Sequence, residues 1–162
     1  MGKVNLLLVD DEQEVLHEWK NHFSPEKFNI FEASTGEVAL QVVEKIRKDK
    51  SPRFLIVLLD VRMPGLDGLQ VLERIKSRIP FAKIFIITGN VEVQNITDAA
   101  FLTGKFGGDG FFEKSRIDFD ELKRQINDFL NEEKTKLLKV KSIKNALEHL
   151  VPKVDISLPY DI

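Results

Sequence analysis

The sequence predicts an α/β protein in which five strand–helix units form one open parallel sheet with helices on both faces. Three observations support this fold class. Short apolar runs alternate with longer amphipathic segments along the chain. The run at 54–59 is apolar at every position, as expected for a central parallel strand covered by helices on both faces. The length of 162 residues corresponds to about one domain.

The first part of the chain contains two strand–helix units, each with a local signal for its helix. The helix expected at 14–23 carries its apolar residues on one side and ends before Pro25. Ser34, followed three residues later by Glu37, has the form of a capping box and predicts a helix from there to about Lys48. The two strands are predicted from apolar runs, at 4–9 and 28–33.

Three further units complete the alternation. Asp67 is an N-cap candidate for a helix at 68–78. A weaker helical pattern at 93–103 precedes a glycine-rich stretch, and Asp118 opens the last helix. The strands of these units are predicted at 54–59, 84–87 and 111–112.

Five such units predict a flavodoxin-like (βα)5 fold, because right-handed crossovers return each helix to a face of the sheet. In open parallel sheets, ligand sites form beyond the carboxyl ends of the strands, where the strand order reverses. Functional residues are therefore expected immediately after each strand.

The composition argues against several classes of function. The chain has no cysteine, which removes disulfides, thiolate metal sites and cysteine nucleophiles. With three histidines and no cysteine, a structural zinc site is not expected. A net charge of −2 argues against direct binding of nucleic acid. The longest apolar run, at 54–59, is far shorter than the ~20 residues that cross a bilayer. The N-terminus lacks the features of a secretory signal, so a cytoplasmic location without membrane contact is expected.

The last helix is predicted to extend beyond a compact domain. We expect one domain over residues 1–130 and a helical extension with a C-terminal tail over 131–162. A seam at residues 122–150 suggests a coiled coil and a homodimer, whereas an amphipathic helix folding back on its own domain and a solvated linker helix remain alternatives. Glu133 and Lys136 interrupt the seam, whose apolar members are Leu122, Ile126, Phe129, Val140, Ile143, Leu147 and Leu150.

Polar side chains follow four of the predicted strands. Asp10 and Asp11 follow the first strand, Asp60 the third, Thr88 the fourth, and Lys114 the fifth after one intervening residue. Carboxylates brought together repel one another unless a cation is present, and Mg²⁺ suits carboxylate and phosphate oxygens. Each residue alone is more often a turn residue, a helix cap or a solvated side chain. Their shared position at strand ends favours a phosphoryl group held by metal, ammonium and hydroxyl.

Four segments of the chain resemble the receiver domain of two-component response regulators. They occur in the order of that family, and the resemblance covers about residues 3–130 of this sequence. The segment at 58–68 (LLDVRMPGLDG) is highly specific. The other three are 7–12 (LLVDDE), 86–89 (IITG) and 110–114 (GFFEK).

The resemblance implies a cytoplasmic signalling phosphoprotein that catalyses only its own phosphorylation and dephosphorylation. It implies that Asp60 accepts a phosphoryl group from a sensor histidine kinase or a histidine phosphotransfer protein. Asp11 and Asp60 would bind Mg²⁺ through their side chains and Arg62 through its backbone carbonyl, while Asp10 would act mostly through a bound water. Lys114 would contact the acyl phosphate.

The resemblance also implies a switch, in which Thr88 moves toward the phosphoryl group and Phe111 repacks. Our own hypothesis is that this shift alters the face formed by the fourth helix, fifth strand and fifth helix, and that, if the last helix dimerises, phosphorylation changes its pairing. Phe111 is adjacent to Phe112 in a strand, so one of the two faces the core in any case. The sequence departs from the family at Ser115, where proline is usual, and the stretch between Thr88 and Lys114 is a few residues longer than usual.

Two other functions are alternatives. An aspartyl-phosphate phosphatase would need an Asp-x-Asp pair after the first strand, but position 12 is Glu12; after the third strand, position 62 is Arg62. A dimerisation scaffold that is not phosphorylated would not need the acidic residues at the strand ends. Labelling with a small phosphodonor distinguishes the receiver from this scaffold.

Overall fold

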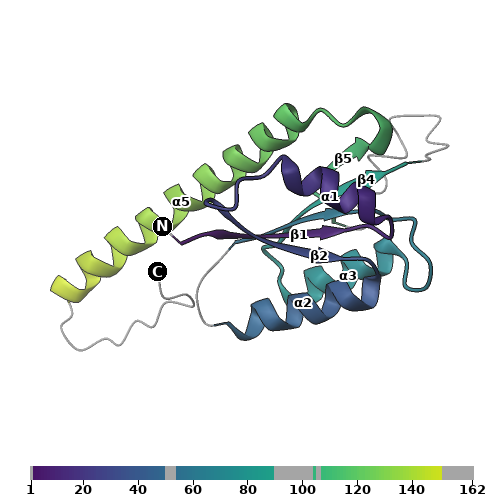
Figure 1. Ribbon diagram of the computed structural model, residues 1–162. Helices are drawn as coiled ribbons and strands as arrows, with labels where there is room; N and C mark the ends of the chain where they lie inside the picture. The colour runs from purple at the N-terminus through teal and green to yellow at the C-terminus, as the bar shows by residue number, and fades with distance from the viewer. Residues whose placement is uncertain (1, 50–53, 90–103, 105–106, 151–162) are drawn as a thin grey trace. The chain divides into compact units, whose positions relative to one another are not determined.

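The computed structural model describes residues 2–49, 54–89, 104 and 107–150, and the five strands in these residues form one parallel sheet (Figure 1). The strand order is β2-β1-β3-β4-β5. This order is that of a flavodoxin-like sheet and confirms the predicted fold class. The strands are β1 (Val4–Val9), β2 (Phe28–Ala33), β3 (Leu55–Leu59), β4 (Lys83–Thr88) and β5 (Gly110–Glu113).

The helices of the described residues agree with the sequence analysis to within a few residues at their ends. The helix expected at 93–103 and the residues 105–106 of the glycine-rich stretch lie outside the described residues. The helices are α1 (Gln13–Asn21), α2 (Gly36–Lys48), α3 (Gly68–Arg78), the 3-10 turn η1 (Lys114–Arg116) and α5 (Phe119–Leu150).

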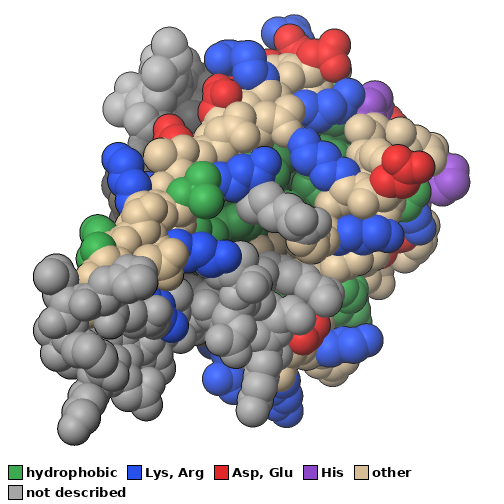
Figure 2. Space-filling view, turned by 90° about the vertical axis from the view of Figure 1, so that its left-hand side faces the viewer, with side chains coloured by type: hydrophobic (Ala, Val, Ile, Leu, Met, Phe, Trp, Pro, Cys, Tyr) green, Lys and Arg blue, Asp and Glu red, His purple; other side chains and the backbone are tan. Residues whose placement is uncertain are grey.

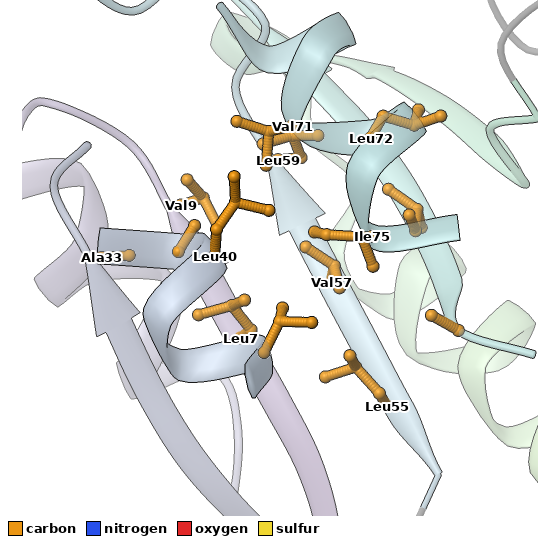
Figure 3. Packing of buried hydrophobic residues seen from close by; sticks show 14 of the residues in the cluster. Leu7, Val9, Ala33, Leu40, Leu55, Val57, Leu59, Val71, Leu72 and Ile75 are labelled. Atoms are coloured by element: carbon orange, nitrogen blue, oxygen red, sulfur yellow. The ribbon is translucent and has the colours of Figure 1, made fainter. Parts of the chain in front are cut away.

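Helices cover both faces of the sheet. Figure 1 shows α2 and α3 on one face and α1 on the other. Every side chain of β1 and β3 is buried, as expected for central strands covered from two sides. In the core on the α2 and α3 side, side chains of both helices pack between those of the strands (Figure 3). Its members include Leu7, Val9, Leu40, Val57, Leu59, Val71, Leu72 and Ile75.

The start of α2 differs from the predicted capping box. Thr35, and not Ser34, is the N-cap, because its extended backbone lets its hydroxyl accept a hydrogen bond from the Val38 amide at 3.2 Å. Gly36 then begins the helix at a close contact, since a Cβ there would lie 2.6 Å from Val71 Cγ2. The other predicted cap is present, and Asp67 accepts a hydrogen bond from the Gln70 amide at 2.9 Å.

The chain divides into two compact units, residues 1–118 and 119–162. In the second unit, α5 runs without a break from Phe119 to Leu150. Leu122 and Ile126 of the predicted seam are buried, whereas its later members Val140, Ile143 and Leu147 are exposed. The predicted end of the helix at Pro152 lies outside the described residues, and the predicted domain boundary at residue 130 stays a prediction.

The described helices include none that is both long and apolar enough to cross a bilayer. The face of the molecule shown in Figure 2 carries basic and acidic side chains near one another, with hydrophobic side chains in small separate groups.

Candidate functional site

The carboxyl ends of β1 and β3 bring three aspartates together. The backbone ladder continues past both strands, with the Asp10 amide bonded to the Ala33 carbonyl and the Asp60 amide to the Val9 carbonyl. β1 and β3 are neighbours at the point where the strand order reverses. One carboxylate oxygen each from Asp10, Asp11 and Asp60 lie within 4.8 Å of one another. Asp10 and Asp60 are buried there, and Asp11 is exposed.

Two tight turns orient the buried carboxylates. Asp10 Oδ1 accepts a hydrogen bond from the Glu12 amide at 2.9 Å, and Asp60 Oδ1 accepts one from the Arg62 amide at 2.9 Å. Turns of this kind are stabilised by short polar side chains that form a hydrogen bond with the backbone two residues later. Each aspartate therefore uses one oxygen to fix its own loop and directs the other into the site.

Lys114 supplies the positive charge of the site. It follows β5 directly and begins the turn η1. Its Nζ lies 2.8 Å from Asp10 Oδ2, 2.8 Å from Glu12 Oε1 and 3.1 Å from Asp60 Oδ2. The first of these contacts is an ion pair without hydrogen-bond geometry, because Asp10 Oδ2 has no hydrogen-bond partner. The ammonium thus joins the ends of three strands at one point.

The electrostatics of the site combine burial with charge pairing. Burial raises the pKa of Asp10 above its ordinary value of 3.8, against the opposing effects of Lys114 and the Glu12 amide. Burial alone would lower the pKa of Lys114, but its close contacts with the carboxylates of Asp10, Glu12 and Asp60 outweigh this and raise it. Three carboxylates lie within ion-pair distance of this one ammonium, so the site holds more acidic than basic side chains.

Asp10→Asn is expected to stabilise the fold at neutral pH without divalent ions. The folded protein binds the Asp10 proton more tightly than the unfolded chain, so stability falls as pH rises from 3.8 through the raised pKa. Asparagine removes that loss and still offers an oxygen to the Glu12 amide. Urea unfolding at several pH values measures the effect. Asp11→Asn is the control, because Asp11 is exposed. Equal stabilities of the Asp10 variant and wild type at neutral pH would contradict the prediction.

The other predicted site residues take different positions. Thr88 ends β4 and is buried, and its hydroxyl oxygen lacks a hydrogen-bond partner among the described residues. Phe111 in β5 is partly buried and packs against the core on the α2 and α3 side. The ring of Phe112 lies 6.2 Å from that of Phe85. Ser115, at the position where the family usually has proline, donates a hydrogen bond to Glu113 at 2.7 Å.

The donor set fits a hard divalent cation such as Mg²⁺. The side chains that converge are carboxylates, the ligands that this ion prefers. The buried side-chain polar atoms without a hydrogen-bond partner in the described residues are Asp10 Oδ2 and Thr88 Oγ1, both of predicted site residues. Buried acceptors of this kind are rare unless a water or an ion completes them.

Sequence reasoning missed two residues of the site. Glu12 bonds Lys114, and its signal is its position directly after the Asp pair. Gly68 begins α3 against the Asp60 loop, where its amide bonds the Val61 carbonyl at 3.1 Å. A Cβ on Gly68 would overlap the Asp60 carbonyl oxygen and Val61 Cα. Only the folded backbone reveals this close approach.

The protein is an α/β protein with an open parallel sheet that places carboxylates at its switch point and a lysine after its last strand. The profile of the response regulator receiver domain family matches residues 6–127 of the chain. The chain belongs to this family and is a receiver domain of two-component signal transduction.

Relatives and solved structures agree with this assignment. The chain is 30% identical over 130 residues to sporulation initiation phosphotransferase F of Bacillus subtilis, covering 80% of this chain and 96% of the relative. It is 27% identical to the regulatory protein AtoC of Escherichia coli, over 90% of this chain and 27% of the relative. Among structures, the signal receiver domain of a putative LuxO repressor from Vibrio parahaemolyticus superposes with a TM-score of 0.69 at 26% identity, covering 85% of this chain and 97% of that one.

The chain thus spans nearly all of the first relative but only about a quarter of AtoC. Receiver domains interact with histidine kinases or phosphotransfer proteins and bind Mg²⁺ at an acidic pocket. The acidic cluster of this chain is compatible with phosphorylation.

Proposed function

We propose that Asp60 is the phosphoacceptor of this receiver and takes its phosphoryl group from a histidine kinase or a histidine phosphotransfer protein. One observation carries the proposal: the buried Asp60 carboxylate lies 3.1 Å from the Lys114 ammonium and within 4.8 Å of two further carboxylates. This arrangement offers a nucleophilic oxygen beside both a cation and a metal-ligand set.

The transfer step is a displacement at phosphorus. A carboxylate oxygen of Asp60 forms a bond to phosphorus while the N–P bond of the phosphohistidine breaks, and the electron pair of that bond returns to the imidazole. Catalysis of such a step depends on positioning and on stabilising charge over the phosphoryl oxygens. The turn from Asp60 to Arg62 holds the nucleophile in place, and Lys114 supplies charge from the end of β5.

Mg²⁺ supplies positive charge beside the phosphoryl oxygens when bound. Asp11 and Asp60 would hold the ion through side-chain oxygens, and Arg62 through its carbonyl. Asp10 would hold it through a water, which suits its buried Oδ2 without a hydrogen-bond partner. The only chemistry proposed for the chain is its own phosphorylation and dephosphorylation.

The response to phosphorylation is proposed to run through Thr88 and Phe111. An acyl phosphate adds charge and acceptor oxygens at the end of β3. The buried Thr88 hydroxyl has a hydrogen bond to give there. Its movement would change the packing beside Phe111, because Thr88 lies in β4, Phe111 lies in β5, and these two strands are paired.

Incubation with acetyl phosphate and Mg²⁺ tests the function. The expected result is one phosphoryl group per chain, seen as an increase in mass that disappears when base hydrolyses the acyl phosphate. No labelling with any small phosphodonor would contradict it and favour an unphosphorylated scaffold. Repeated turnover of phosphate esters would favour a phosphatase instead.

We further propose that residues 1–130 form the receiver domain in the cytoplasm, and that residues 131–162 extend it and allow homodimerisation through the seam at 122–150. The exposed part of that seam, Val140, Ile143 and Leu147, supports the proposal because its 3,4 spacing matches a coiled-coil interface.

Ile143→Lys is expected to abolish self-association, because a charged side chain at a seam position would lose its water on pairing. Light scattering measures the molar mass with and without beryllofluoride and Mg²⁺. Leu138→Lys is the matched control, since Leu138 is 66% exposed and lies outside the seam. A wild-type protein that stays monomeric in both states would contradict dimerisation.

A further inference from the structure

Glu12 makes a contact for which neither its helix nor the proposed transfer step accounts. It is the N-cap residue of α1, in an extended conformation, but its side chain makes no capping hydrogen bond. Ser, Thr, Asp and Asn are the side chains that cap helices well. Instead, Glu12 Oε1 accepts a hydrogen bond at 2.8 Å from Lys114, 102 residues further along the chain. The side chain is therefore directed at the ammonium of the site.

The ammonium of Lys114 is crowded by carboxylates and already donates two hydrogen bonds, to Glu12 and Asp60. An ammonium group carries three N–H donors. Three carboxylates lie within ion-pair distance of Nζ, those of Asp10, Glu12 and Asp60. A phosphoryl group on Asp60 would bring additional acceptor oxygens with a charge of about −1.5 to −2. Lys114 has one N–H donor outside its two hydrogen bonds, so it can bond more than one of these oxygens only if a present contact is given up.

The differences in burial identify the contact that is lost. The Asp10 side chain is 0% exposed and that of Asp60 is 4% exposed, whereas that of Glu12 is 65% exposed. A buried carboxylate that loses its cation is strongly destabilised, because water cannot replace the partner. An exposed carboxylate is hydrated when its ion pair breaks and loses little. Asp60 itself carries the phosphoryl group after transfer, so of the other two partners Glu12 is the one that Lys114 exchanges for the phosphoryl group.

We propose that Glu12 is a positioning residue that competes with the phosphoryl group for Lys114 and so lowers the affinity of the site for that group. Glu12 holds the ammonium over the acidic residues in the unphosphorylated state and releases it on phosphorylation. The inference rests on the proposed function, because it takes Asp60 as the acceptor. It adds a residue that sets the balance between the two states.

Two variants of Glu12 separate contact from charge. Glu12→Gln removes the charge, whereas Glu12→Asp keeps the charge but shortens the side chain by one methylene, out of reach of Lys114. Calorimetric titration with beryllofluoride at saturating Mg²⁺ is expected to show both variants binding roughly two- to five-fold tighter than wild type. Glu14→Gln is the matched control, because Glu14 is an exposed acid in the first turn of α1, and its affinity should equal that of wild type.

A second readout follows the contact itself. The ¹⁵N resonance of the Lys114 ammonium in the metal-free protein is expected to shift in both Glu12 variants and to stay in place in Glu14→Gln. Tighter binding by Glu12→Gln alone would overturn the proposal, because the effect would then be one of charge at a distance. Unchanged affinity in both variants would also overturn it. A wild-type protein that binds no beryllofluoride would contradict the proposed function instead.

Discussion

Asp60→Asn is expected to reduce labelling by acetyl phosphate to background, a loss of at least ~10³-fold. The asparagine amide has the shape of the carboxylate but is neutral and a poor nucleophile. The loop should keep its conformation, because the amide oxygen can still accept the hydrogen bond that Arg62 donates at 2.9 Å. Intact-protein mass spectrometry in the presence of Mg²⁺ measures the phosphoryl group directly.

The matched control for this variant is Asp128→Asn. Asp128 is an exposed aspartate of α5, 3.8 Å from Arg124, so the same chemical change occurs away from the acidic cluster. Its labelling should equal that of wild type. Labelling of Asp60→Asn at the wild-type level would assign the acceptor to a different side chain, and peptide mapping would then identify it.

Gly68→Ala is expected to destabilise the fold by about 2 kcal/mol and to slow phosphorylation as well. A Cβ at this position overlaps the Asp60 carbonyl oxygen and Val61 Cα, which are backbone atoms that cannot turn aside like a flexible side chain. Alanine favours a helix over glycine by up to ~1 kcal/mol, which offsets only part of the overlap. The loop that carries the acceptor must then move away from α3.

Urea unfolding and the rate of labelling by acetyl phosphate measure the two effects of this variant. Gly104→Ala is the control, because a Cβ at Gly104 meets no atom within 4 Å. The prediction would be contradicted if the Gly68→Ala protein were as stable as wild type and were phosphorylated at the same rate. The loop after β3 would then accommodate the Cβ without disturbing the acceptor.

The fold could be predicted because its strongest signals are periodic. The unbroken apolar run at 54–59 reports burial on both faces, and β3 is indeed buried at every residue. The cap at Asp67 was predictable since it is local, with donor and acceptor three residues apart. The cap of α2 was misplaced by one residue because Ser34 and Thr35 both carry a hydroxyl, and only the backbone conformation distinguishes them.

The candidate site was predictable only in part. Strand ends align in any parallel sheet, so the convergence of Asp10, Asp60 and Lys114 follows from topology. The direction of the Glu12 side chain does not, because a Glu that precedes a helix is ordinarily a solvated residue. Its partner lies 102 residues away, and no local pattern encodes a contact at that separation.

The position of Lys114 has a consequence for biogenesis. The acidic residues belong to the first and third strands, but their counter-ion follows the fifth, so a nascent chain emerging from the ribosome exposes the repelling charges well before the neutralising one. Contacts of such large sequence separation form late in folding. Synthesis must therefore pass β5 before Lys114 can pair with these carboxylates, so the site is complete only when the sheet is complete.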